Sequence, residues 1–133
     1  MLNLAYCLMA GRNMREKQII WIGSSKKDLM ALSEDVIDVI GYALHYAQAG
    51  NKHDDAKVLK GFHGATVIEI IADDKAGTYR AVYTVKYKEV VFVLHVFQKK
   101  SKSGIATPKK EMELVEARLK QAEEIYKEKY LKI

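Results

Sequence analysis

An arginine and a histidine in the second half of the chain are well suited to chemistry on a phosphodiester. Arg80 lies in the strand-like run Thr78–Lys86, and His95 lies in the apolar run Val90–Phe97. If residues 87 and 88 form a two-residue turn between these runs, Arg80 lies opposite His95. Arginine donates paired hydrogen bonds to a phosphate, and histidine transfers a proton near neutral pH. The alternative is an exposed strand arginine beside a core histidine whose hydrogen bonds are satisfied.

Lysines gather between the second of these runs and the last predicted helix. Residues 97–110 contain no acidic residue and five lysines, which are Lys99, Lys100, Lys102, Lys109 and Lys110. Such a segment is well suited to follow a row of phosphate groups. The alternative is a solvated run of charges that keeps the chain soluble. His63, in a glycine-flanked loop, is expected to be structural or exposed.

Several common catalytic motifs are missing from the sequence. It contains no glycine-rich phosphate loop, no His-Glu-x-x-His, no cysteine pair and no Gly-x-Ser-x-Gly. We therefore expect neither a metal nor a cofactor. The single cysteine, Cys7, excludes an internal disulfide and fits a reducing, cytoplasmic compartment. The apolar start of the chain is too short to span a bilayer, so no membrane partner is expected.

The pattern along the chain predicts the order β-α-α-β-β-β-α, an α+β domain with a mainly antiparallel sheet. We expect strands at 18–22, 65–71, 78–86 and 90–97, a loop from Gly50 to Gly64, and helices at 26–32, from Ser33 to Gly50 and from Thr107 onward. The first two helices are expected to form an α-hairpin laid on the sheet. Ser33 and Thr107 are the predicted N-caps, with Pro108 at the first helical position.

Length and charge set the outer limits of these predictions. A chain of 133 residues has the size of one domain, which we place at 14–133. Residues 1–13 are expected to be a weakly ordered extension or a mis-called start, because Met14 is a second possible start. The net charge is +5: through Gly77 there are nine basic and ten acidic residues, and from Thr78 onward there are thirteen and seven. A basic half favours a polyanionic partner, either nucleic acid or an acidic protein segment.

Four segments together resemble the phage-derived branch of the RelE/HigB toxin family. They are Leu59–Phe62, Thr78–Tyr83, Val93–Ser101 and Thr107-Pro108, within a similarity that covers roughly residues 18–125. The resemblance implies a RelE-like fold and the toxin of a type II toxin–antitoxin pair. Such a toxin cleaves mRNA, often on the ribosome, and is neutralised by a cognate antitoxin that is often a helix-turn-helix protein.

The resemblance also implies a metal-free mechanism in which the RNA 2′-hydroxyl attacks the adjacent phosphate. Arg80 matches the strand arginine that would stabilise charge in the transition state. Lys99 and Lys100 match a basic strand end that would contact the phosphate or protonate the leaving oxygen. His95 completes the expected catalytic set, and Lys86, Lys102, Lys109 and Lys110 are the expected RNA-binding residues.

One departure from the family pattern leaves the general base open. RelE carries basic residues on the strand before the arginine strand, whereas this chain has Glu69, Asp73 and Asp74 there. Glu69, His95 or a ribosomal group are the candidates for the base. The same departure supports an alternative function, a catalytically decayed family member that binds or regulates the antitoxin.

Overall fold

The computed structural model describes residues 16–62, 64, 66–99 and 107–131. The elements in chain order are β1 (Gln18–Trp21), α2 (Ser25–Met30), α3 (Glu34–Gln48), β2 (Lys57–Val58), β3 (Val67–Asp74), β4 (Gly77–Thr84), β5 (Val90–Lys99) and α4 (Lys109–Tyr130). This is the predicted order with one addition, because β2 lies within the stretch that was expected to be a loop. Two residues are too short to produce a strand pattern in the sequence. The predicted extension at residues 1–13 lies outside the described residues.

The strands form one sheet in the order β1-β5-β4-β3-β2. β1 runs parallel to β5, and the other three pairings are antiparallel. The prediction of an α+β chain with a mainly antiparallel sheet is therefore confirmed. β1 pairs only with residues Val90–Val93, the first part of β5.

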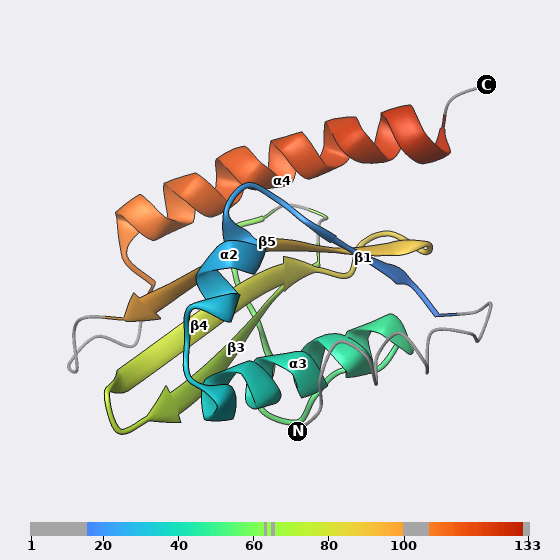
Figure 1. The fold of residues 1–133 in the computed structure, drawn as a ribbon. Coiled ribbons are helices and arrows are strands. Elements are labelled where there is room, and N and C mark those ends of the chain that lie inside the picture. Colours follow the sequence, from blue (N-terminus) through green and yellow to red (C-terminus); the bar gives the residue numbers. More distant parts are fainter. Residues whose placement is uncertain (1–15, 63, 65, 100–106, 132–133) are drawn as a thin grey trace.

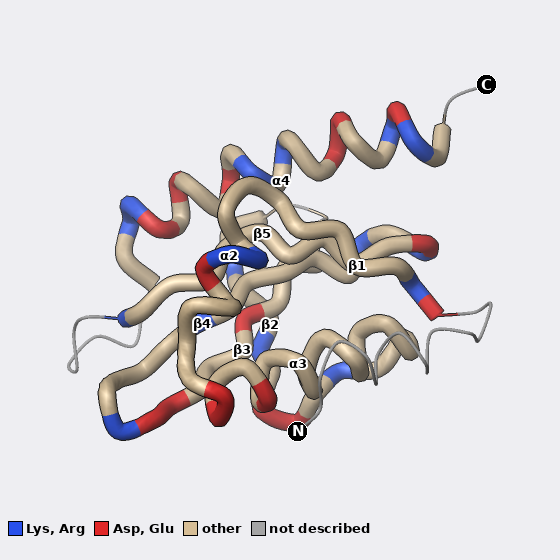
Figure 2. The backbone as a smooth tube through the Cα atoms, viewed as in Figure 1, with Lys and Arg blue, Asp and Glu red and all other residues tan. Residues whose placement is uncertain are grey.

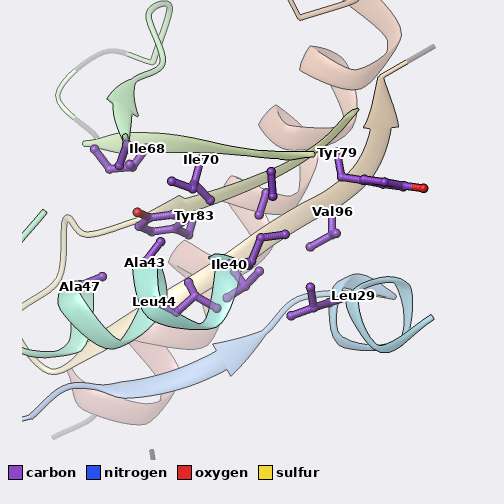
Figure 3. Close-up of a cluster of buried hydrophobic side chains, with 14 of the residues drawn as sticks. Leu29, Ile40, Ala43, Leu44, Ala47, Ile68, Ile70, Tyr79, Tyr83 and Val96 are labelled. Carbon is purple, nitrogen blue, oxygen red and sulfur yellow. The ribbon is translucent and has the colours of Figure 1, made fainter. Parts of the chain in front are cut away.

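Helices cover both faces of the sheet (Figure 1). On one face, Leu29 of α2 and Ile40 and Leu44 of α3 pack against the central strands (Figure 3). On the other face, Val115 and Ala122 of α4 pack against a second cluster of buried residues from the sheet. Because strand side chains alternate between faces, β5 supplies both clusters and is buried along most of its length.

The β3–β4 hairpin is tighter than predicted. Asp74 pairs with Gly77, so that only Lys75 and Ala76 form the turn. An Asp74 carboxylate oxygen accepts hydrogen bonds from the backbone N–H groups of Ala76 and Gly77, at 2.8 and 3.0 Å. This local bonding lets the strand continue through residues that were expected to belong to a wider turn.

The predicted register of β4 and β5 is wrong. Arg80 lies opposite Phe97, and His95 lies opposite Val82. The connection between the strands contains one residue more than a two-residue turn allows, and an irregularity in the pairing beside Val82 adds another. Together they move His95 two residues away from the predicted position.

Of the two predicted N-caps, Ser33 is confirmed and Thr107 is wrong. The Oγ of Ser33 accepts a hydrogen bond from the Val36 N–H at 3.3 Å, so Ser33 is the N-cap of α3, as predicted. Thr107 is not the N-cap of α4: the cap position is Pro108, without a side-chain hydrogen bond. The Thr107 hydroxyl instead contacts Glu69 and Arg80. No described helix is long and apolar enough to cross a membrane.

Candidate functional site

Arg80 lies inside the molecule on the face of the sheet that α4 covers. Its Nη1 donates hydrogen bonds to Glu69 Oε2 and to Thr107 Oγ1, both at 2.9 Å. The Thr107 hydroxyl in turn donates to the same Glu69 oxygen at 2.9 Å. Arg80 is only 2% exposed, and Glu69 is also buried. The guanidinium charge is thus balanced by a carboxylate, and the segment leading into α4 lies over it.

His95 is the centre of a second polar cluster on the same face. Its Nε2 lies 3.3 and 3.4 Å from the two carboxylate oxygens of Glu111, in the first turn of α4. Its Nδ1 lies 3.4 Å from Nη1 of Arg118, two turns further along the same helix. Both ring nitrogens therefore have partners from α4. The ring stacks on Phe97, with the centroids 4.6 Å apart.

Arg118 connects this cluster to β5 and to the residue that precedes α2. Its Nη1 also donates to the Leu94 carbonyl at 3.0 Å, and its Nη2 donates to Ser24 Oγ at 3.2 Å. Ser24 Oγ donates to the Asp28 carboxylate at 2.7 Å. Arg118 passes against Gly23, where a Cβ atom would lie 2.9 Å from the guanidinium. A chain of polar contacts thus runs from α2 over β5 to α4.

The environment of His95 favours the neutral imidazole. Burial lowers the pKa of His95 below its ordinary value. The hydrogen bond and the negative charge of Glu111 raise this pKa, and the charge of Asp28 raises it slightly. The positive charge of Arg118 lowers it. The net shift of the His95 pKa is downward, and burial is its largest cause. A neutral ring at pH 7 can donate from one nitrogen and accept at the other.

A pocket of about 370 Å³ that is open to solvent gives access to this second cluster. The residues that line it come from α2, from the second half of β5 and from α4, and they are Asp28, Ala31, Leu32, His95, Val96, Phe97, Gln98 and Glu111. β1 has already ended at this point, so no strand covers this edge of β5 among the described residues. A ligand in the pocket would contact Glu111 and His95, whereas Arg80 is not among the residues that line it.

The lysines predicted to be catalytic (Lys99 and Lys100) or RNA-binding (Lys86, Lys102, Lys109 and Lys110) separate into two groups where the structure describes them. Lys99 ends β5, and the exposed Lys109 and Lys110 begin α4. The end of β5 and the start of α4 lie at the same side of the molecule (Figure 2). Lys86 lies in the connection that precedes β5, at the opposite end of that strand, with its Nζ 5.5 Å from the centre of the Tyr87 ring. Lys100 and Lys102 lie outside the described residues, as does His63.

Glu111 and Arg118, which contact His95, were not predicted from the sequence, and neither was the contact of Thr107 with Arg80 and Glu69. Glu111 and Arg118 lie on one side of the last helix, since seven residues make two helical turns. A charged pair on the buried side of an amphipathic helix was a signal that could have indicated them. Glu69 was considered as a possible base, but the structure places it against Arg80. No group of three or more metal-ligating side chains occurs among the described residues.

A protein-family model matches most of the chain. The family model described as Phage derived protein Gp49-like (DUF891) matches residues 27–120. The chain belongs to this Gp49-like family. The family is associated with the toxins of toxin–antitoxin pairs. The match begins in α2 and ends within α4, so it includes both polar clusters. A search of curated proteins found no match.

Proposed function

We propose that this Gp49-like protein is the toxin of a type II toxin–antitoxin pair and acts as a metal-free endoribonuclease on mRNA. In this proposal it works in the cytoplasm, in association with the ribosome, and a helix-turn-helix antitoxin neutralises it. Membership in a family associated with such toxins is the observation that carries the proposal. The open pocket lined by His95 and Glu111, with Arg118 in contact with His95, is consistent with it.

The proposed reaction requires proton transfer and a cationic surface for the RNA backbone. His95 and Glu111 are side chains that can exchange protons, and they are reached from the pocket. Lys99, Lys109 and Lys110 lie next to its lining residues Gln98 and Glu111 in the sequence. In the proposal they hold phosphates beside the pocket, together with Lys100 and Lys102.

Arg80 was predicted from the resemblance to stabilise charge on the phosphate. Its burial and its contact with Glu69 favour a different role, holding the sheet and the segment at Thr107 in position. Direct contact with RNA requires Arg80, which is 2% exposed, to become accessible. The catalytic role of Arg80 stays a prediction, and it is tested by cleavage with a folded Arg80 variant.

The second candidate function is that of a decayed toxin that only binds or regulates its antitoxin. The Arg80–Glu69 pair favours it, because a buried carboxylate balances the charge that the resemblance assigns to the phosphate. Loss of catalysis would leave the fold and the surface for the antitoxin intact.

Inducible expression in a bacterial host tests the proposed function. The chain is expressed alone and together with the protein encoded next to it, and growth and transcript integrity are followed. We expect growth arrest and cut transcripts with the chain alone, and recovery with its neighbour. Normal growth and intact transcripts at confirmed high expression would support the decayed toxin instead.

A further inference from the structure

The contacts of His95 fix which of its nitrogens carries a proton. A guanidinium has only donors, so the contact between Arg118 Nη1 and His95 Nδ1 requires a lone pair on Nδ1. The proton of the neutral ring is then on Nε2, where the Glu111 carboxylate accepts it at 3.3 and 3.4 Å. In this arrangement the lone pair of His95 is directed at Arg118 and is not available to a substrate.

Glu111 differs from His95 in its access to solvent. Its side chain is 22% exposed and lines the pocket, whereas the His95 side chain is 7% exposed. A carboxylate has four lone pairs, so Glu111 keeps acceptor capacity after it has accepted the Nε2–H of His95. A carboxylate in the first turn of a helix is also electrostatically favoured. Asp28 and Glu111 are the described carboxylates that line this pocket, and Glu111 is the one that contacts His95.

We propose that Glu111 is the catalytic proton acceptor of the site and that His95 and Arg118 are positioning residues that hold it. This inference rests on the proposed function and names the general base that the sequence left open. Arg118 is anchored by Leu94 and Ser24, so it holds the histidine ring in one orientation. The ring then directs its Nε2–H at Glu111, and stacking on Phe97 limits its rotation.

The proposed step begins when a Glu111 oxygen takes the proton of the RNA 2′-hydroxyl. The 2′ oxygen forms a bond to the adjacent phosphorus as the bond from phosphorus to the 5′ oxygen breaks. The products are a 2′,3′-cyclic phosphate and a 5′ hydroxyl, whose oxygen takes its proton from water. Glu111 then returns its proton to the hydroxide that remains, so the protein ends the cycle unchanged.

Cleavage rates of matched variants test the role of Glu111. The substrate is a defined mRNA on programmed ribosomes, and every variant is first checked for folding by circular dichroism. Glu111→Gln is expected to lower the rate by about 10²–10⁴, the usual contribution of a general base. Glu113→Gln, an exposed carboxylate on the same helix, is the matched control and is expected to cleave like the parent. Added formate, a small carboxylate, should partly restore cleavage by Glu111→Ala but not by Arg118→Met.

The positioning residues are tested by rate and by nitrogen NMR. Arg118→Met is expected to lower the cleavage rate less than Glu111→Gln does, and Arg118→Lys, which keeps a donor, should recover part of the loss. In the parent, the ¹⁵N shifts of His95, assigned by their loss in His95→Gln, should report a protonated Nε2 and an unprotonated Nδ1. Arg118→Met should yield a mixture of the two tautomers.

The outcomes separate this inference from the proposed function. A parent that does not cleave RNA overturns both. A parent that cleaves, with Glu111→Gln equally fast, overturns only the role of Glu111. A protonated Nδ1 in the neutral ring of the parent would likewise overturn the positioning scheme, whether or not RNA is cut.

Discussion

Arg80 shows at the scale of single residues how a buried charge depends on its partner. Its guanidinium is balanced by Glu69 inside the molecule. Removing one member of a buried ion pair takes the opposite charge away from the other, which typically costs about 3–5 kcal/mol. We therefore predict that Arg80→Met and Glu69→Leu each lower the free energy of unfolding by about this amount. The double variant should lose less than either single variant, and urea unfolding measures all three.

Thr107→Val is the control for this prediction. It removes one hydroxyl from the cluster and leaves both charges in place, so the expected loss is about 1 kcal/mol. If the effects of Arg80→Met and Glu69→Leu simply added in the double variant, the two side chains would not form a coupled pair. Loss of cleavage in Arg80→Met is interpretable only where this variant is still folded.

His95 should make the stability of the protein depend on pH. Its pKa is lowered in the folded state, chiefly by burial, so the unfolded chain binds more protons between the two pKa values. The free energy of unfolding should therefore fall as the pH decreases through the ordinary histidine pKa of about 6.5. Urea unfolding at neutral and mildly acidic pH should show a smaller decrease for His95→Gln. An equal decrease in both proteins would contradict the assigned environment.

At the scale of elements, a row of tyrosines fixes the second half of α4. Tyr126 stacks on Tyr87 and on Tyr130, with ring centroids 4.1 and 5.1 Å apart, and its hydroxyl donates to Glu89 at 2.7 Å. Tyr126→Leu should lower the free energy of unfolding by about 1–2 kcal/mol, because two stacked pairs are lost. Tyr126→Phe keeps the stacking and should lose clearly less. If Tyr126→Leu and Tyr126→Phe lowered the free energy of unfolding equally in thermal or urea unfolding, stacking would not be what anchors the helix.

The elements themselves were largely predictable, because each leaves a local pattern. Ser33 with the acidic residues after it marked the start of α3, and the β-branched runs marked β1, β3, β4 and β5. The register of β4 and β5 was not predictable in this way, because an extra residue in the connection and an irregularity in the pairing leave no pattern. The contacts of the site join residues distant in sequence, such as Arg118 and Ser24, so helix and strand periods could not indicate them.

At the scale of the whole molecule, described lysines lie at both ends of β5, and Lys99, Lys109 and Lys110 are the ones at the end beside the pocket. Changing Lys99, Lys109 and Lys110 to Gln should weaken binding to single-stranded RNA and reduce the slope of log affinity against log salt by about 2, or about 0.7 for each lost phosphate contact. Lys86→Gln, at the other end of the strand, should reduce the slope by about 0.7 at most. Titrations of a labelled RNA at several salt concentrations measure both. Unchanged slope in the triple variant would contradict this placement of the RNA.

We propose that this Gp49-like protein cuts mRNA by an acid–base reaction at the pocket between α2 and α4. Mapping of 5′ ends on a defined mRNA, carried by programmed ribosomes and treated with the purified protein, tests it most directly. We predict discrete new 5′ ends and a 2′,3′-cyclic phosphate on the upstream product with the parent and with Glu113→Gln, and a strong reduction with Glu111→Gln. Intact mRNA with the folded parent protein would contradict the claim.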